Sequence, residues 1–313
     1  MIACTEYEIL MVDETTWDMH SLYKPIFKEH TVTRFTSVDF HYEKQMLFIG
    51  QFPWPSGLSG EIASAKLVNG TLTEMKTIST TGNKPLVAVD WINDKIYWKC
   101  SRGECGYGGA IYMANLDGSD KRLVKNNIVS TEDSNFQLDP INRWIYLRSK
   151  TVTGRNTLRV DVLQRINMDN SNNHQILDTC DTYLCFYRFA IDNTDHGKVY
   201  WMNFMSSTVK SIDADNSNLT SYDFGAYEFE KILFVPRKII TTIDVSFTIA
   251  HKGSLYGMPE YRLYDLNGAI ARLDTRNSTI TYLPPLATRV KLETYRVFHQ
   301  TAQPKPRVTS TII

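Results

Sequence analysis

An apolar stretch ending in aspartate, then a short polar turn and an aromatic-rich apolar stretch, recurs along the chain. Successive aspartates are 51, 49, 53 and 52 residues apart (90 − 39, 139 − 90, 192 − 139 and 244 − 192). This period indicates an array of one supersecondary unit that buries its apolar face against its neighbours. The repeated apolar–aspartate pairs are Val38-Asp39, Val89-Asp90, Leu138-Asp139, Ile191-Asp192 and Ile243-Asp244.

The unit that begins at Pro85 has the clearest pattern. Its β-rich stretches 85–90 and 95–99 flank the turn 91–94, and the stretches 110–116 and 121–124 flank the turn 117–120. Each pair of stretches predicts a hairpin. Four strands in about fifty residues, arranged as two hairpins in series, are typical of one blade of a β-propeller.

The other units keep this plan, although the first and fifth are weaker. An N-terminal segment, 8–13, is typical of the later half of a blade, and segment 295–299 is expected to complete that blade. We therefore predict an all-β fold: a six-bladed β-propeller with four-stranded antiparallel blades over residues 1–304, its sixth blade closed by the N- and C-terminal segments. Residues 305–313 are expected to be a tail or the start of a linker. Further predicted strands are 38–39, 46–49, 136–139, 144–147, 164–169, 174–177, 189–192, 198–201, 209–213, 219–222, 243–244, 254–257 and 270–274.

Charge and hydropathy exclude two classes of partner. The chain has 34 basic and 34 acidic residues, so no net field favours nucleic acid. No window contains the roughly 18 uninterrupted apolar residues of a membrane helix, and the N-terminus lacks the pattern of a signal peptide. We expect signal peptide and anchor to be absent from this chain, so that any membrane contact runs through other segments. This leaves a cytosolic protein or an excerpt of a longer one.

Cysteines and glycosylation sequons favour the excerpt of a secreted protein. Each of two cysteine pairs encloses four residues in a predicted loop and is expected to form a local disulfide. A zinc site is the alternative, but it would need shorter spacing and adjacent histidines. We predict no metal ligand, no cofactor and an extracellular or cell-surface location. The cysteines are Cys100, Cys105, Cys180 and Cys185, and the sequon asparagines are Asn69, Asn218 and Asn277.

The residues resemble the six-bladed propeller of the low-density lipoprotein receptor and its relatives, named for a Tyr-Trp-Thr-Asp repeat. The stretch 85–98 looks like the family's run of Leu-Ala-Val-Asp-Trp, turn and Ile-Tyr-Trp, and 115–119 is similar to its outer hairpin turn. Val297-Phe298-His299 with Gln303-Pro304 resembles the segment that closes these propellers before an epidermal-growth-factor-like module. The resemblance covers almost the whole chain.

The chain departs from the family at the name-giving tetrapeptide. None of the aligned stretches 48–51, 97–100, 146–149, 200–203 and 256–259 keeps the terminal aspartate. In the family that carboxylate helps to tie neighbouring blades, so different inter-blade contacts are expected here. The repeated aspartates at the ends of the first strands are expected to hydrogen-bond local backbone amides; a functional ring of acids is the alternative.

Candidate binding residues gather on one predicted face. All three sequons fall at or just past the turn between a blade's third and fourth strands, whereas both cysteine pairs fall in loops on the opposite face. We expect a ligand on that opposite face, where exposed aromatic side chains can anchor a partner. In the alternative, Phe52 and Trp54 cover the blade edge, and Lys99, Arg148 and Met202 are solvated rim residues. The predicted ligand-binding residues are Gln51, Phe52, Trp54, Lys99, Arg102, Arg148 and Met202.

The resemblance implies a non-catalytic, extracellular, protein-binding module of a low-density lipoprotein receptor-like protein. Its partner would be a protein ligand or an adjacent epidermal-growth-factor-like module. A structural propeller of a basement-membrane protein is the first alternative. A calcium-dependent propeller hydrolase is a more remote one, because the chain has no nucleophile elbow, phosphate loop or HExxH motif.

Overall fold

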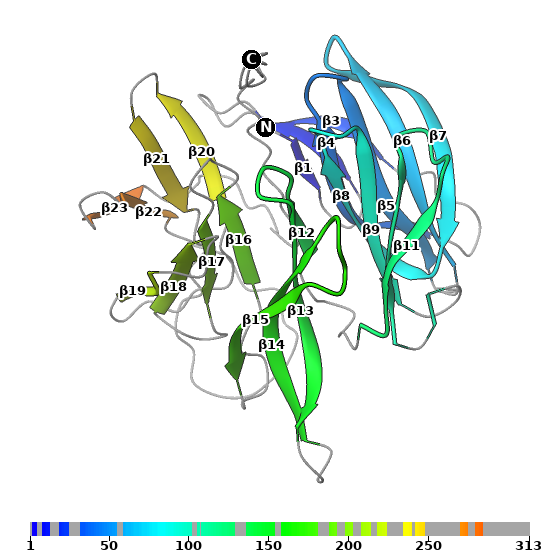
Figure 1. Ribbon diagram of the computed structural model, residues 1–313. Coiled ribbons are helices and arrows are strands. Elements are labelled where there is room, and N and C mark those ends of the chain that lie inside the picture. Colours follow the sequence, from blue (N-terminus) through cyan, green and yellow to red (C-terminus); the bar gives the residue numbers. More distant parts are fainter. Residues whose placement is uncertain are drawn as a thin grey trace, which may run out of the picture.

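All elements that the structure describes are β-strands (Figure 1). The computed structural model describes residues 2–4, 8–12, 19–24, 32–54, 59–101, 105–106, 108–128, 136–153, 158–180, 188–192, 198–202, 208–213, 218–223, 234–239, 242–247, 270–274 and 279–283. Within these ranges no helix is long and apolar enough to cross a membrane.

Four antiparallel four-stranded sheets, which we call blades 1 to 4, follow one another along the chain. In each blade the strands pair in sequence order, as expected for hairpins in series. Blade 1 contains β4 (Val32–His41), β5 (Met46–Trp54), β6 (Gly60–Val68) and β7 (Thr71–Thr81). Blade 2 contains β8 (Asn83–Asp90), β9 (Lys95–Ser101), β10 (Ala110–Asn115) and β11 (Arg122–Asn126).

Blades 3 and 4 repeat this arrangement. Blade 3 contains β12 (Phe136–Asp139), β13 (Trp144–Thr153), β14 (Leu158–Asn167) and β15 (His174–Cys180). Blade 4 contains β16 (Arg188–Asp192), β17 (Lys198–Met202), β18 (Thr208–Asp213) and β19 (Thr220–Asp223).

Smaller sheets stand at both ends of the described chain. The N-terminal sheet joins β1 (Ile2–Cys4), β2 (Ile9–Val12) and β3 (Met19–Tyr23). After blade 4 come two pairs, β20 (Phe234–Ile239) with β21 (Thr242–Phe247) and β22 (Ile270–Asp274) with β23 (Thr279–Leu283). Strand β21 contacts β22, so the two pairs are neighbours.

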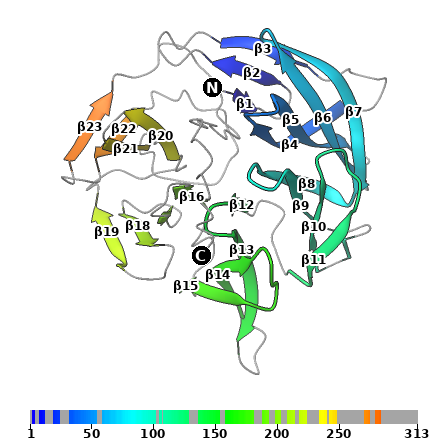
Figure 2. The same cartoon turned by 45° about the horizontal axis from the view of Figure 1, so that its top comes forward.

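The sheets surround a common centre in chain order (Figure 2). The first strand of each blade lies innermost: β4 contacts β8, β8 contacts β12, β12 contacts β16, and β16 contacts β20. Four-stranded antiparallel sheets packed face to face around an axis define a β-propeller. The predicted fold class is confirmed, while the count of six blades stays a prediction because the segment expected to close the ring, 295–299, lies outside the described residues.

Strand predictions for blades 2, 3 and 4 are confirmed, and the two ends of the chain differ from expectation. The N-terminal segment forms three strands rather than a two-stranded half blade. Ile243 and Asp244 lie inside β21, paired with β20, instead of ending an innermost strand. Strand β20 takes the innermost place, as its contact with β16 indicates.

Side chains of one innermost strand bond the backbone of the next blade. Ser37 Oγ accepts a hydrogen bond from Val87 N at 2.7 Å, and Asp39 Oδ2 accepts one from Val89 N at 2.8 Å. Both acceptors belong to β4 and both amides to β8. These bonds satisfy backbone groups on an edge that no strand of the same blade pairs.

A side chain of the innermost strand also bonds the next blade between blades 3 and 4. Gln137 Nε2 donates to Phe189 O at 2.9 Å. Gln137 pairs with Tyr146 as Asp39 pairs with Phe48, so Gln137 occupies the position that Asp39 has in blade 1. Blade 2 carries Ala88 at the equivalent position, which has no polar atom to make the bond.

Gly50 explains part of the divergence from the family tetrapeptide. A Cβ at this position would lie 2.3 Å from Pro85 O in the next blade and 2.8 Å from Thr36 Oγ1. Thr36 Oγ1 also donates a hydrogen bond to the same Pro85 carbonyl. Blades 1 and 2 therefore approach so closely here that a side chain would push them apart.

The hydrophobic core lies between blades, because alternate side chains of each inner strand face opposite neighbours. On β9, Trp98 packs with Phe48 of blade 1, whereas Tyr97 packs with Ile145 of blade 3. On β13, Tyr146 faces blade 4. Tyr97, Trp98 and Tyr146 are all at most 1% exposed. The aromatic stretch of the repeat thus fills both seams around a blade.

An ion pair is buried within blade 3. Arg148 on β13 donates through Nη2 to Asp161 Oδ2 on β14, and the two side chains are 2% and 4% exposed. Removing one partner of a buried pair leaves the other charge uncompensated, which costs about 3–5 kcal/mol.

We expect Asp161→Ala to lower the free energy of unfolding by about 3–5 kcal/mol, because Arg148 keeps its buried charge. Denaturant unfolding followed by tryptophan fluorescence measures the loss. The double change Arg148→Met with Asp161→Leu removes both charges and should be closer to wild type than the single variant. Equal losses in the single and double variants would contradict an electrostatic cause.

Candidate functional site

The two ends of the blades form two different faces. In each blade, the connections between the first and second strands and between the third and fourth strands lie at one end, which we call the turn face. The remaining connections lie at the other end, the loop face. In blade 3, Met168 N of one turn donates to Arg143 O of the other at 2.9 Å, which shows that the two turns meet.

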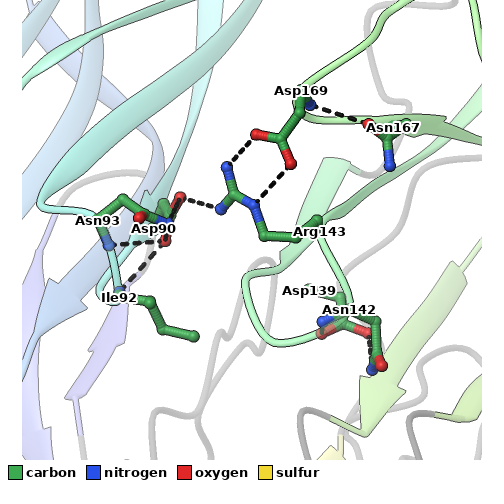
Figure 3. A network of polar contacts seen from close by, with 8 residues as sticks. All are labelled: Asp90, Ile92, Asn93, Asp139, Asn142, Arg143, Asn167 and Asp169. Carbon is green, nitrogen blue, oxygen red and sulfur yellow. Dashed lines mark hydrogen bonds and ion pairs between the residues drawn. The ribbon is translucent and has the colours of Figure 1, made fainter. Parts of the chain in front are cut away.

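Arg143 joins two blades on the turn face (Figure 3). Its Nη1 lies 2.5 Å from Asp90 Oδ2 at the end of β8. Its Nε and Nη2 donate to Asp169 at 3.1 and 2.7 Å, within blade 3. Asp90 is fully buried, so Arg143 neutralises a carboxylate that water does not reach.

The repeated aspartates differ in what they bond. Asp90 accepts from Ile92 N and Asn93 N, both at 3.2 Å, and Asp139 accepts from Asn142 N at 3.0 Å. These two confirm the predicted bonds to local amides. Asp39 also bonds a local amide, that of Phe40, and in addition it accepts from Val89 N of the next blade. The side chains of Asp192 and Asp244 lie outside the described residues.

A residue with positive φ closes the first turn of blades 2 and 3 and reaches back to the preceding blade. Asp94 (φ 53°) lies 2.8 Å from His41 Nε2 and 3.5 Å from Lys44 Nζ in blade 1. Arg143 (φ 61°) reaches Asp90 in the same manner. The side chain of the equivalent Gln45 (φ 53°) donates through Nε2 to Tyr42 O of its own turn at 2.6 Å. Asp94 and Arg143 therefore act as staples between blades.

These contacts shift the pKa of several carboxyl groups. The hydrogen bonds from Arg143 hold the pKa of Asp169 below its ordinary value. Burial raises the pKa of Asp94, but the bond to His41 and the charge of Lys44 outweigh it, and the net direction is down. Burial raises the pKa of Asp139 above its ordinary value, against the opposing bonds from Asn142.

The described part of the loop face centres on a disulfide in blade 2. Cys100 and Cys105 are disulfide-bonded, with a Cα–Cα distance of 5.9 Å, which confirms that predicted pair. Next to it, Gly109 (φ 71°) accepts through its carbonyl from Ile128 N at 3.2 Å. The disulfide loop and the segment leading to blade 3 are thus tied together.

The second predicted pair is described only in part. Cys180 is disulfide-bonded, and Cys185, its predicted partner, lies outside the described residues. The Cys180–Cys185 pairing stays a prediction.

Three of the predicted ligand-binding residues are buried. Phe52, Lys99 and Arg148 are 4%, 4% and 2% exposed, because they lie in strands whose side chains face neighbouring blades. We correct their assignment to an exposed face accordingly. Gln51 is half-buried and donates to Glu61 Oε2 at 3.2 Å.

The other predicted ligand-binding residues stay predictions. Arg102 and the side chains of Trp54 and Met202 lie outside the described residues. Residues 51–54 were expected in a loop but belong to β5, because β4 begins as early as Val32 and pairs with them.

The two described sequon asparagines occupy the same place in the fold, as predicted. Asn69 lies in the turn between β6 and β7, and Asn218 lies just before β19. Asn277 is outside the described residues but falls between β22 and β23. In all three, the sequon threonine is the first residue of the outermost strand: Thr71, Thr220 and Thr279.

Sequence reasoning missed the staples and the buried ion pair. Asp94 and Arg143 fall in turns of the predicted hairpins, and nothing local distinguishes a turn residue that reaches another blade. Their spacing of four residues after the repeated aspartate is the one signal that could have found them. Across the described ranges, no cluster of three or more His, Cys, Asp or Glu side chains is arranged to hold a metal ion.

No protein-family model matches the chain. A chain of the nidogen/laminin complex is similar over 91% of this chain and 92% of its own length, with a TM-score of 0.58 and 14% identity. A chain of the mitotic checkpoint complex matches over 91% and 74%, with a TM-score of 0.53 and 11% identity. A variant of the Synechocystis apocarotenoid oxygenase matches over 90% and 70%, with a TM-score of 0.52 and 14% identity. At these identities the likeness shows the β-propeller fold alone, which enzymes and other proteins share.

We expect Arg143→Met to raise the pKa of Asp169 toward the ordinary value of about 3.9. A carboxyl whose pKa is lowered by folding contributes stability above its unfolded pKa and loses that contribution as pH falls through its folded pKa. Carbon-13 NMR titration of the Asp169 carboxyl measures the shift. An unchanged midpoint in the variant would contradict the proposed cause.

We expect the hydroxyl groups of Tyr97 and Tyr146 to titrate late, because burial raises the pKa of each to about 12. In the unfolded chain, tyrosine hydroxyls ionise near pH 10. The contribution of these two groups to the free energy of unfolding is therefore complete below about pH 10 and is lost as pH rises toward 12. Each of the variants Tyr97→Phe and Tyr146→Phe should lack one late-ionising phenol, which ultraviolet titration measures. Tyr42→Phe, at an exposed position, is the control and should leave both late-ionising phenols in place.

Proposed function

We propose that this chain is a non-catalytic, protein-binding β-propeller of the low-density lipoprotein receptor type, from a secreted or cell-surface protein. The observation that carries the proposal is the difference between the two faces of the propeller. Staples and sequons occupy the turn face, whereas the loop face holds a disulfide-constrained loop. A disulfide reduces the freedom a loop loses on binding, and so favours association.

Two further observations support a protein partner and a secretory route. The likeness to a chain of the nidogen/laminin complex, which spans nearly the full length of both chains, gives the fold a precedent in a protein complex. The disulfide at Cys100–Cys105 is typical of an oxidising compartment. Under this proposal the protein ligand sits on the loop face, near the connections that follow β9 and β11.

Blocking the loop face tests the proposal. Asn127 is exposed in the connection after β11, and Val129→Thr creates the acceptor sequence Asn-Ile-Thr at that asparagine. We expect the added glycan to reduce capture of partner proteins from conditioned medium by at least about tenfold, because a glycan covers the surface sterically. Quantitative mass spectrometry of the captured proteins measures the change.

A matched variant places the glycan on the turn face. His174→Thr creates Asn-Asn-Thr at Asn172, an exposed residue in the turn between β14 and β15. This variant should retain capture within about twofold, since its glycan stands at the opposite ends of the strands. A mobility shift removed by glycosidase verifies occupancy in both variants. Equal effects of the two glycans would contradict binding through the loop face.

A matrix role is the second candidate, favoured by the nidogen/laminin likeness. Surface plasmon resonance with laminin as the immobilised probe separates the two candidates. Saturable binding that the glycan at Asn127 abolishes would support a matrix propeller. Absence of laminin binding, with retained capture of a cell-surface or secreted partner, would support a receptor module.

A further inference from the structure

Two exposed apolar side chains on the turn face lie beside sequons. Six large apolar side chains are exposed in the described part of the chain, and two of them flank sequon asparagines directly. Val68, 48% exposed, precedes Asn69, and Leu219, 63% exposed, follows Asn218. Leu219 is the most exposed of the six, so two separate turns combine an acceptor asparagine with an apolar side chain in water.

Both asparagines have the same local geometry. Asn69 and Asn218 have positive φ values of 49° and 53°, and both are exposed. Asn69 and Gly70 (φ 74°) form the two central residues of a hairpin turn with the positive φ pair of type I′. Such a turn projects the asparagine side chain away from the sheet.

We propose that Asn69 and Asn218 carry N-linked glycans whose protein-proximal sugars cover Val68 and Leu219. The amide nitrogen Nδ2 of each asparagine attacks the anomeric carbon of a lipid-linked oligosaccharide. A nitrogen–carbon bond forms, the bond from that carbon to the lipid pyrophosphate breaks, and the amide loses one proton. The inference rests on the secretory route of the proposed function.

The folded structure accommodates both glycans. Asn218 Nδ2 donates to Asp213 Oδ2 at 2.8 Å, and a glycosylated amide keeps one N–H for that bond. At Gly70, next to Asn69, no atom lies within 4 Å of the position that a Cβ would occupy, so the tip of the turn is open. Covering Val68 and Leu219 removes apolar area from water, which lowers the tendency to associate.

Expression with an appended secretion leader sends the protein through the secretory pathway. The test of glycosylation then does not depend on the natural location of the protein. Glycosidase treatment in oxygen-18 water followed by peptide mass mapping should mark Asn69 and Asn218 as occupied. Unmodified peptides at both asparagines in secreted, folded protein would overturn the proposal, while leaving the loop-face binding tests valid.

The cover over Val68 has its own test. Thr71→Val removes the sequon without changing Asn69, and it should raise static light scattering of the secreted protein at least about twofold. Val68→Thr combined with Thr71→Val should return the scattering to the wild-type value. Thr73→Val, an exposed threonine of the same strand outside any sequon, is the control. Scattering of Thr71→Val equal to that of Thr73→Val would overturn the covering role.

Discussion

Hydrogen bonds between the innermost strands of neighbouring blades are the interaction on which the rest of this structure depends. A single blade cannot bury its own faces, so its stability comes from the adjacent blades. Asp39 and Gln137, at equivalent positions, bond the next innermost strand, and Ser37 adds a second bond between blades 1 and 2. Because these bonds set how the blades meet, Tyr97 and Trp98 can fill the seams on either side of one strand.

The turn face and the loop face, at opposite ends of the strands, have different features. At the turn face, Asp94 and Arg143 close hairpins and staple blades 2 and 3 to the preceding blade. The sequons lie at the same end, at the start of outermost strands. At the loop face, the disulfide at Cys100–Cys105 and its neighbouring segment leave connections whose lengths can vary without disturbing the seams. A binding role therefore fits the loop face better than the stapled one.

The chain compensates for its divergence from the family repeat. None of the aligned tetrapeptides ends in aspartate, and other side chains bond the neighbouring blades. At the third residue of the stretch 48–51, Gly50 admits the Pro85 carbonyl of the next blade. Elsewhere a serine, a glutamine or an arginine holds each seam, so chemically different groups perform one structural task. This variety is consistent with the absence of a matching family model.

The sequence by itself determined the strands of blades 2 to 4, their turns and the position of the sequons, because alternation and turn chemistry act over a few neighbouring residues. It placed Phe52, Lys99 and Arg148 on a surface, and it did not detect the reach of Arg143 to Asp90. Burial and pairing across a seam depend on residues about fifty positions away, which no local pattern contains. Only the tertiary structure decided that Lys99 and Arg148 lie inside, because only there do adjacent blades exclude water from both sides of a strand.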